Sequence, residues 1–452
     1  MSELHDALDS AHRLALEWLD SLPDRTVPAR ASAAEVMAAL GELPDGPRPA
    51  AEVIELLGTA AEPGLTAIPG GRWYGMVMGG TMPAALAADW LVSAWDQNNA
   101  LRAVTPATVA LEDLADRWLL DLLGLPPECG VGMPTGGTMS NFTCLVTARD
   151  TVLRRAGWDV AKRGLVGCPG IRVLVGAERH DSIDKVLRLM GLGEPEAVEA
   201  DEQGRIRVDA LADALSQGRG VPTVVALQAG NVHSGSFDDF SAAIPLAHAA
   251  GAWVHVDGAF GLFAAASPRL RHLTAGFEAA DSWATDAHKT LNVPYDCGIA
   301  IVRDVAAMRG SLGMHGDYLI QDSAGEPFDR VPEMSRRARA TTVWAALASM
   351  GRSGVAELVE RFCAHATMFA EGLARIPDVE VLNEVVFTQV CASFGSDERT
   401  QRVVQRMLAD GTAWTTGSRW HDQAVLRVAL CNWSTTDSDV RTTLEALQRA
   451  AA

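Results

Sequence analysis

Short β-branched runs alternate with amphipathic segments between residues 130 and 305, and this alternation limits the folds open to the chain. The runs lie at residues 171–175, 223–227, 252–256, 282–284 and 299–302. Segments with helical apolar spacing separate many of them. Such alternation is typical of a mostly parallel sheet with helices on both faces, in which ligands bind beyond the carboxyl ends of the strands. The sequence therefore predicts an α/β fold with its site at one edge of the sheet.

The remaining segments have other patterns, which predict how the chain is divided. Residues 1–65 have helical apolar spacing broken by proline and glycine clusters, and we expect a helical arm that packs on a partner subunit. Residues 66–315 are expected to form the large domain. Residues 316–452 mix helical segments with strand-like runs, as at 390–394 and 425–430, and predict a loop and a smaller α+β domain.

Composition argues against several classes of partner. The 452 residues carry a formal net charge of −19 without a lysine or arginine block, which argues against nucleic acid and anionic membrane partners. No apolar run approaches the roughly 20 residues that cross a bilayer, and the acidic start differs from a signal peptide. The seven cysteines include no CxxC pair, and the eleven histidines are not spaced as metal ligands. We expect a cytoplasmic protein without a metal site.

A glycine-rich stretch at residues 134–141 leads directly into a predicted helix. Its glycines let the backbone approach an anion. The hydroxyls of Thr138 and Ser140, with the free N–H groups of the helix start, can then hold a phosphate. No lysine follows the glycines, so the stretch is not a P-loop. The alternative is a plain helix cap after a glycine turn.

Three further side chains follow predicted strands. His180 lies at a strand-to-helix turn, Asp257 ends a nearly apolar strand, and Lys289 lies at a sharp turn between two apolar runs. Each has a plain alternative: a helix cap, an Asx turn and a surface turn. Together with the glycine-rich stretch they match one chemistry. A lysine amine forms a Schiff base with a pyridoxal aldehyde, an aspartate pairs with the pyridine nitrogen, and a helix start holds the phosphate.

In these motifs the chain resembles the group II pyridoxal-phosphate-dependent decarboxylases, which include the aromatic amino acid and glutamate decarboxylases and are related to the sphingosine-phosphate lyases. The resemblance runs from about residue 71 to about 447, and its motifs are TGGTMS at 135–140, His180, GNVHSG at 230–235 with Asp238, HVDGA at 255–259, DAHK at 286–289 and LRVALCN at 426–432. It implies the fold-type I, aspartate-aminotransferase-like architecture, with a mostly parallel sheet of about seven strands and a smaller C-terminal domain. It also implies a homodimer with shared active sites.

The resemblance implies roles for single residues around the cofactor, pyridoxal 5'-phosphate. Lys289 forms the Schiff base, and His288 helps to hold the phosphate. Asp257 pairs with the pyridine nitrogen, His180 stacks on one ring face, and Ala259 lies against the other. The further cofactor-binding residues that it implies are Gly137, Thr138, Met139, Ser140, Asn231 and Asp286.

The same resemblance suggests where the substrate binds. Arg427 matches an arginine thought to meet the substrate carboxylate, with an ion pair at the core edge as its alternative. Trp73, Tyr74 and Asn98 are expected to line the site, some of them from the neighbouring subunit. Relatives that act on aromatic substrates have large apolar walls where this chain has Asn98 and Asn99, so we expect a polar or smaller substrate side chain.

Two departures from the family pattern bear on the reaction. Asp286 stands where the aromatic and glutamate enzymes usually have asparagine, although the sphingosine-phosphate lyases resemble this chain there. Residues 320–335 lack the loop tyrosine thought to donate a proton, and Phe328 lies nearest its place. In plant relatives a phenylalanine there accompanies aldehyde formation. His315 or Tyr318 is the competing proton donor.

The leading functional prediction is α-decarboxylation of an L-amino acid by a carboxy-lyase. Aldol cleavage, transamination and oxidative deamination to an aldehyde remain the closest alternatives, because the cofactor residues do not separate these outcomes. A non-catalytic binding protein with a relic site is the least favoured alternative, since none of the cofactor residues is lost.

Overall fold

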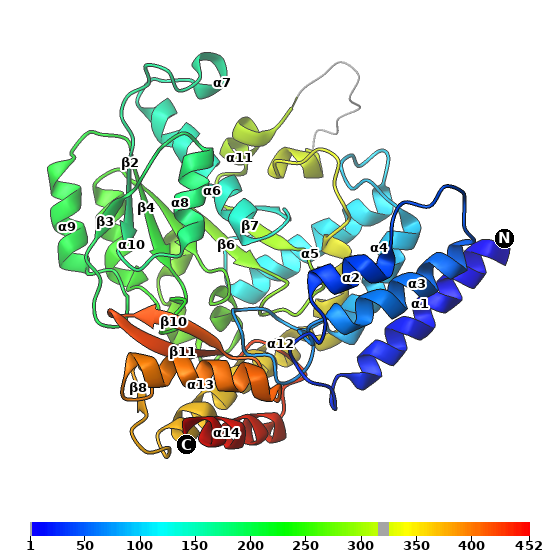
Figure 1. Ribbon diagram of the computed structural model, residues 1–452. Coiled ribbons are helices and arrows are strands. Elements are labelled where there is room, and N and C mark those ends of the chain that lie inside the picture. Colours follow the sequence, from blue (N-terminus) through cyan, green and yellow to red (C-terminus); the bar gives the residue numbers. More distant parts are fainter. Residues whose placement is uncertain (1, 315–324) are drawn as a thin grey trace.

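A seven-stranded sheet forms the centre of the large domain in this computed structural model, which describes residues 2–314 and 325–452 (Figure 1). Its strand order is β1-β7-β6-β5-β4-β2-β3. Six strands run in one direction, and β7 is antiparallel to both of its neighbours. The strands are β1 Gly130–Gly132, β2 Arg172–Gly176, β3 Glu196–Val198, β4 Thr223–Gln228, β5 Trp253–Asp257, β6 Ser282–Asp286 and β7 Gly298–Val302.

Helices cover both faces of this sheet, as alternating side chains on the strands require. On β4, Val224 packs in a cluster with α6, α8 and α11, whereas its neighbour Val225 packs in a cluster with α5, α9, α10 and α12. The bounds are α5 Pro106–Leu123, α6 Gly137–Arg155, α7 Val160–Arg163, α8 Asp181–Leu189, α9 Val208–Gln217, α10 Phe240–Ala249 and α11 Val305–Leu312. Short 3-10 helices are η2 Leu262–Ala266, η3 Arg271–Thr274, η4 Phe277–Ala279 and η5 Pro327–Arg330.

The C-terminal part of the chain forms a second, antiparallel sheet with order β10-β11-β9-β8. Helix α12 (Ala340–Leu373) joins the two domains and bends at Gly351, whose φ of 62° is outside the helical region. The other elements are β8 Glu380–Val381, β9 Gln389–Ser393, α13 Asp397–Asp410, β10 Thr416–Trp420, β11 Gln423–Ala429 and α14 Asp437–Ala451. The architecture confirms the predicted fold class, a mostly parallel sheet with a smaller C-terminal α+β domain.

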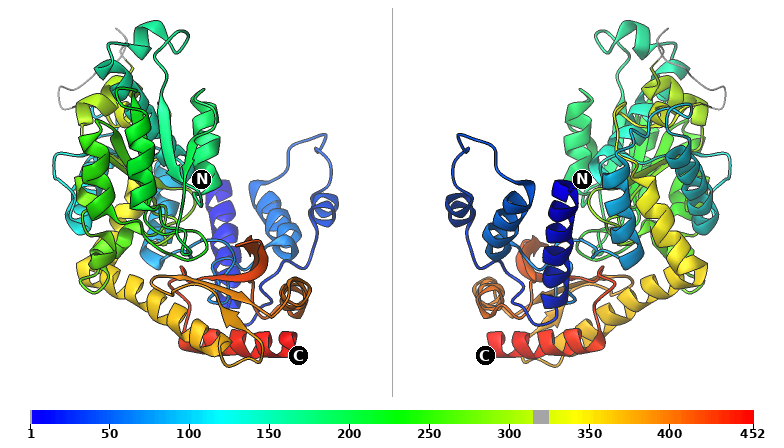
Figure 2. Two further views of the ribbon diagram at one scale, coloured as in Figure 1. Left: turned by 90° about the vertical axis from the view of Figure 1, so that its left-hand side faces the viewer. Right: turned by 90° about the vertical axis from the view of Figure 1, so that its right-hand side faces the viewer.

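The N-terminal arm stands away from the large sheet (Figure 2). It contains α1 Ser2–Ser21, α2 Ala33–Leu40, α3 Ala50–Ala61 and η1 Glu62–Gly64, and α4 Pro83–Trp95 follows it. None of α1, α2 and α3 contains a buried residue. Helices with apolar positions of this kind ordinarily bury them against another element. Within the described residues, no helix is both long and apolar enough to span a bilayer.

Candidate active site

A pocket of about 460 Å³ opens at the carboxyl edge of the large sheet. Parallel strands direct their carboxyl ends to this edge, so residues far apart in the sequence meet there. The pocket receives side chains from the ends of β4, β5 and β6, from the turn after β2 and from the start of α6. The predicted site residues that line it are Gly137, Thr138, Met139, His180, Asp257, Ala259, Asp286, His288, Lys289 and Arg427.

Lys289 lies in the connection between β6 and β7, as the sequence predicted for a sharp turn between two strands. Its Nζ atom is 2.9 Å from Oδ2 of Asp286. Burial acts to lower the pKa of Lys289, but the nearby Asp286 carboxylate outweighs burial, so the pKa is raised above its usual value. The amine is therefore held as an ammonium beside its carboxylate partner at neutral pH.

His288 is adjacent to this ion pair, and its hydrogen bonds define its tautomer. Its Nδ1 atom accepts a hydrogen bond of 3.1 Å from the backbone N–H of Cys297. Burial lowers the pKa of His288, which favours the neutral ring. The proton of that neutral ring is consequently on Nε2, which lies 3.6 Å from Oδ1 of Asp286.

Asp257 is the last residue of β5, and its carboxylate is buried at the sheet edge. It accepts hydrogen bonds of 3.2 Å from the side-chain amide of Asn141 and 3.2 Å from the backbone N–H of Ala259. Burial raises the pKa of Asp257, against the opposing effect of the positive charge on Lys289. The side chain lines the pocket and can face a cationic group there.

The start of α6 offers an anion-binding site. Its N-cap residue is Gly136, and no side chain caps the helix, so the first backbone N–H groups are free to meet a ligand. A Cβ atom on Gly137 would lie 2.6 Å from Oδ2 of Asp286, so only glycine fits this close approach. Thr138 and Met139 line the pocket, as predicted.

Ser140 forms a local hydrogen bond in α6, and its predicted phosphate contact stays a prediction. Its hydroxyl donates to the backbone carbonyl of Gly136 at 3.3 Å, within the same helical turn. The residue is fully buried and does not line the pocket. A hydroxyl in the first turn of a helix often bonds to its own backbone, and here that local bond directs the side chain away from the ligand site.

His180 caps a helix and also lines the pocket, so the cap does not exclude its predicted contact with a ligand. Its Nδ1 atom accepts a 3.1 Å hydrogen bond from the backbone N–H of Ser182 and caps α8. The exposed ring also lines the pocket. The cap fixes the ring where it can lie against a planar ligand.

The side chain of Asn231 forms hydrogen bonds within and beside its own turn. Its side-chain amide donates to the carbonyl of Glu178 at 3.1 Å, and its side-chain oxygen accepts from the backbone N–H groups of His233 and Ser234 at 2.9 and 3.2 Å. The residue is buried and does not line the pocket, although its neighbour Gly230 does. The side chain therefore has a structural role in this turn, and its predicted cofactor contact stays a prediction.

The predicted aromatic substrate contacts are also absent from the pocket. Tyr74 lies in the core of the small domain, with its ring centroid 4.9 Å from that of Phe369. Trp73 is buried against Trp414 at 5.1 Å. Asn98 is exposed and accepts from the backbone N–H of Arg336 at 2.9 Å, outside the pocket of its own chain.

The proposed substitute for the loop tyrosine is not at this pocket either. Phe328 is 2% exposed in η5 and is not among the pocket residues. The η5 helix packs on β1 and α11, away from the sheet edge that carries Lys289. The competing donors, His315 and Tyr318, lie outside the described residues.

Several pocket residues were not predicted. Met76, Val77 and Met78 come from the glycine-rich loop before α4, and Tyr295 comes from the connection that carries the lysine. The ring of Tyr295 lies 4.3 Å from that of His288. Their residue types are not specific to this chemistry. The only sequence signal that could have pointed to them is their position next to the recognised motifs.

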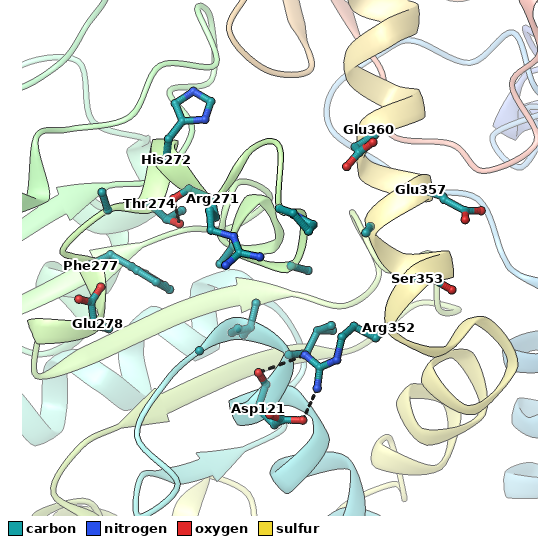
Figure 3. A pocket seen from close by; sticks show the side chains of 18 of the residues that line it. Asp121, Arg271, His272, Thr274, Phe277, Glu278, Arg352, Ser353, Glu357 and Glu360 are labelled. Carbon is teal, nitrogen blue, oxygen red and sulfur yellow. Dashed lines mark hydrogen bonds and ion pairs between the residues drawn. The ribbon is translucent and has the colours of Figure 1, made fainter.

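A larger cavity, of about 1110 Å³, lies elsewhere in the molecule (Figure 3). It is bounded by the C-terminal end of α5, by the 3-10 helices η2, η3 and η4, and by α12 beyond its bend. Asp121 and Arg352 form an ion pair at its edge, and Arg271 extends into it. None of the predicted cofactor residues lines this cavity. Chemistry, and not volume, therefore identifies the smaller pocket as the candidate site.

The smaller pocket fits pyridoxal phosphate. The open N–H groups of α6 suit the phosphate, the buried Asp257 suits a protonated ring nitrogen, and Lys289 suits the aldehyde. Ala259, with its small side chain, and His180, with its flat ring, both line this pocket, as a planar ligand requires.

Comparisons with known proteins agree with this geometry. A family described as the pyridoxal-dependent decarboxylase conserved domain matches residues 41–394. The chain is 29% identical over 372 residues to the aromatic-L-amino-acid decarboxylase of Drosophila lebanonensis, covering 77% of this chain and 90% of that protein. It is 28% identical over 334 residues to the cysteine sulfinic acid decarboxylase of Mus musculus, covering 72% and 67%. A crystal structure of Oryza sativa TDC with PLP and tryptamine has a TM-score of 0.92 at 23% identity, covering 100% of this chain and 98% of that one. The chain therefore belongs to the family of pyridoxal-dependent decarboxylases.

Proposed function

We propose that the protein removes the α-carboxyl group of an L-amino acid as carbon dioxide. The observation that carries this proposal is the grouping of Lys289, Asp257 and the open start of α6 around one pocket in a member of this family. Pyridoxal phosphate, when bound, supplies an aldehyde for amines and a ring that takes up the electrons of the broken bond.

The chain's own residues hold and orient the reacting groups. Lys289 would hold the aldehyde end of the cofactor, and the N–H groups at the start of α6 would hold its phosphate. Asp257 would favour the protonated form of the ring nitrogen, in which the ring accepts electrons more readily. His180 and Ala259 line the same pocket and would help to orient the ring.

Trapping carbon dioxide from a panel of amino acids tests the proposal. The panel includes tryptophan and cysteine sulfinate, because relatives of this chain are named for tryptophan and for cysteine sulfinic acid. We expect carbon dioxide and the matching amine in equal amounts, with a preference for polar or smaller side chains. A clear preference for tryptophan would refute that substrate preference. A keto acid or a cleaved side chain without carbon dioxide would favour transamination or aldol cleavage, and carbon dioxide released with an aldehyde in place of the amine would favour oxidative deamination.

Arg427 is the proposed binding site of the substrate carboxylate. It extends from β11 into the pocket and is 8% exposed, and its Nε atom has no hydrogen-bond partner within residues 2–314 and 325–452. Burial lowers the pKa of its guanidinium, and no ion pair compensates it among the residues that the structure describes. A buried cation without an anion is unfavourable, so the pocket suits a ligand that brings a carboxylate.

Replacing Arg427 by glutamine is therefore expected to raise KM by about 10- to 100-fold, because a hydrogen bond to a charged group is worth about 1.5–3 kcal/mol. Steady-state kinetics measure this effect. The matched control is Arg419→Gln on the neighbouring strand β10, where the arginine is exposed and pairs with Asp397 at 2.8 Å. Equal KM values for both variants and the unmodified protein would remove Arg427 from the substrate site.

The raised pKa of Lys289 predicts how the cofactor-free protein captures pyridoxal phosphate. Only the unprotonated amine attacks an aldehyde, so the capture rate is expected to rise with pH through the neutral range. Asp286→Asn removes the carboxylate that raises this pKa, and capture at neutral pH should speed up about tenfold for each unit by which the pKa falls.

The growth of visible absorbance after mixing measures that rate. Asp304→Asn is the control, because Asp304 caps α11 away from the pocket and asparagine is an equally good N-cap. Slower capture by Asp286→Asn than by the control would contradict the conclusion that Asp286 raises the pKa of Lys289.

We infer that the protein is a homodimer. Large apolar side chains are exposed along α4, α5 and their connection, namely Trp90, Leu91, Trp95, Val104 and Trp118. Exposed apolar surface of this extent marks an interface, and the arm helices present more of it. Asn98 lies between Trp95 and Val104 in the sequence, which supports its predicted contact with the partner's site.

Analytical ultracentrifugation tests the dimer. The double variant Trp95→Asp/Val104→Asp is expected to shift the protein toward monomers, because it places charges on side chains that are 47% and 62% exposed. Val166→Asp serves as the control, since Val166 is 94% exposed on a loop away from this surface. An unmodified protein that sediments as an active monomer would overturn the proposal.

Two further predictions, on the division of the chain and on its location in the cell, remain proposals. The division into an arm (1–65), a large domain (66–315) and a C-terminal part (316–452) is supported by the separate sheets. A cytoplasmic location is supported by seven cysteines that are all free thiols.

A further inference from the structure

A buried chain of hydrogen bonds ends at Asp257, and its last link, Asn141, also lines the pocket. The indole nitrogen of Trp253 is 2.9 Å from Oγ of Ser282. The same Oγ is 3.0 Å from Nδ1 of His255, and Nε2 of His255 is 2.8 Å from Oδ1 of Asn141. Nδ2 of Asn141 then reaches Oδ2 of Asp257 at 3.2 Å. All five residues are buried.

The strand geometry explains why these groups meet. Trp253, His255 and Asp257 are at alternate positions of β5 and so share one face of the sheet. The intervening valines pack in the core on the opposite face. Ser282 on β6 is the register partner of His255, and Asn141 comes from α6, which covers this face.

The direction of the bonds follows from the end nearest Asp257. Asn141 turns Nδ2 toward the carboxylate of Asp257, which can only accept, and so turns Oδ1 toward His255. His255 therefore carries its proton on Nε2 and donates it to this oxygen. Nδ1 of the neutral ring then accepts from the hydroxyl of Ser282, and the indole N–H of Trp253 donates to the same hydroxyl oxygen. The opposite direction would turn the Asn141 oxygen toward the carboxylate.

We infer that Asn141, His255 and Ser282 are positioning residues that hold Asp257 ionised and correctly oriented toward the cofactor. The inference rests on the proposed function of Asp257 as the partner of the ring nitrogen. Burial alone favours the neutral acid at this position, and an N–H donor fixed toward the carboxylate opposes that tendency. Burial also lowers the pKa of His255 to about 3, so the histidine stays neutral and keeps its direction at physiological pH.

The experiment uses the full-length protein loaded with pyridoxal phosphate and measures cofactor affinity and spectrum instead of turnover. Ser282→Ala removes the hydroxyl that orients His255, and Asn141→Leu removes the donor to Asp257. Each is expected to raise the cofactor's Kd about tenfold, which corresponds to about 1.4 kcal/mol. Each variant should also shift the pH at which the visible absorbance titrates, and the two shifts should have the same sign.

The double variant distinguishes a connected chain from separate local effects. If the bonds act in series, Ser282→Ala/Asn141→Leu should be little worse than the more severe single variant, because the chain is already broken. Thr147→Val is the matched control: Thr147 is buried in α6, and in the described part of the chain its hydroxyl bonds to the backbone carbonyl of Thr143, at 3.0 Å. This variant should leave Kd and titration unchanged.

Nitrogen-15 spectra of labelled histidine in the loaded protein give a second, direct readout. The His255 signal, assigned by its loss in His255→Gln, should show a proton on Nε2, and Ser282→Ala should weaken that preference. A proton on Nδ1 would overturn the inference. An unchanged Kd and titration in Ser282→Ala would also overturn it while leaving the role of Asp257 intact. Failure of the unmodified protein to bind pyridoxal phosphate would instead refute the proposed function.

Discussion

The Lys289→Ala variant is expected to lose turnover entirely and to lose the covalent link to pyridoxal phosphate. Methyl replaces the amine that attacks the aldehyde, and the chain's other lysines, Lys162 and Lys185, are exposed and do not line the pocket. The visible absorbance of the lysine-bound cofactor should disappear, leaving only the spectrum of free or non-covalently held pyridoxal phosphate.

Borohydride reduction followed by peptide mapping identifies the attachment point. Three lysines in the whole sequence make the assignment unambiguous, since each lies in a different segment. Lys185→Ala is the control, because Lys185 lies on α8 near the pocket but is solvent-exposed. A label on Lys162 or Lys185, or undiminished absorbance in Lys289→Ala, would show that another lysine holds the cofactor.

Replacing Asp257 by asparagine is expected to reduce kcat by about 10²–10³-fold, in the range seen when one buried electrostatic contact to a transition state is removed. Asparagine has the same shape but carries no charge, so it cannot keep the ring nitrogen protonated. Steady-state kinetics measure the loss, and thermal unfolding shows whether the fold persists. Activity close to that of the unmodified protein, with cofactor bound, would mean that Asp257 is not the partner of the ring nitrogen.

Much of the large domain could be predicted because its signals are local. The five predicted runs overlap β2, β4, β5, β6 and β7, whose apolar residues are buried on both faces. Strands β1 and β3 were missed. Each spans three residues, and β1 contains two glycines, so neither has enough side chains to produce a pattern. Pairing with a longer neighbour forms these edges, and pairing partners are not encoded locally.

The site could be predicted in position but not always in orientation. Asp257, Asp286 and His180 lie where strands end, and a strand end at this edge of the sheet faces the ligand site. The orientations of Tyr74 and Asn231 could not be predicted, because the direction of a side chain in a loop depends on its tertiary neighbours. Tyr74 packs in the core of the small domain with its ring against Phe369, and backbone N–H groups occupy the asparagine's oxygen. Nothing in either sequence stretch records those partners.

The reversed direction of β7 has a consequence for protein engineering. Because β7 runs back along β6, the lysine-bearing connection is a hairpin with both ends held by adjacent hydrogen-bonded strands. A one-residue slip between such strands moves every side chain to the opposite face. The position of the reactive amine therefore depends on the register between β6 and β7. Transplanting this chemistry to another scaffold would require β5, β6, β7 and the first turn of α6 as a single block.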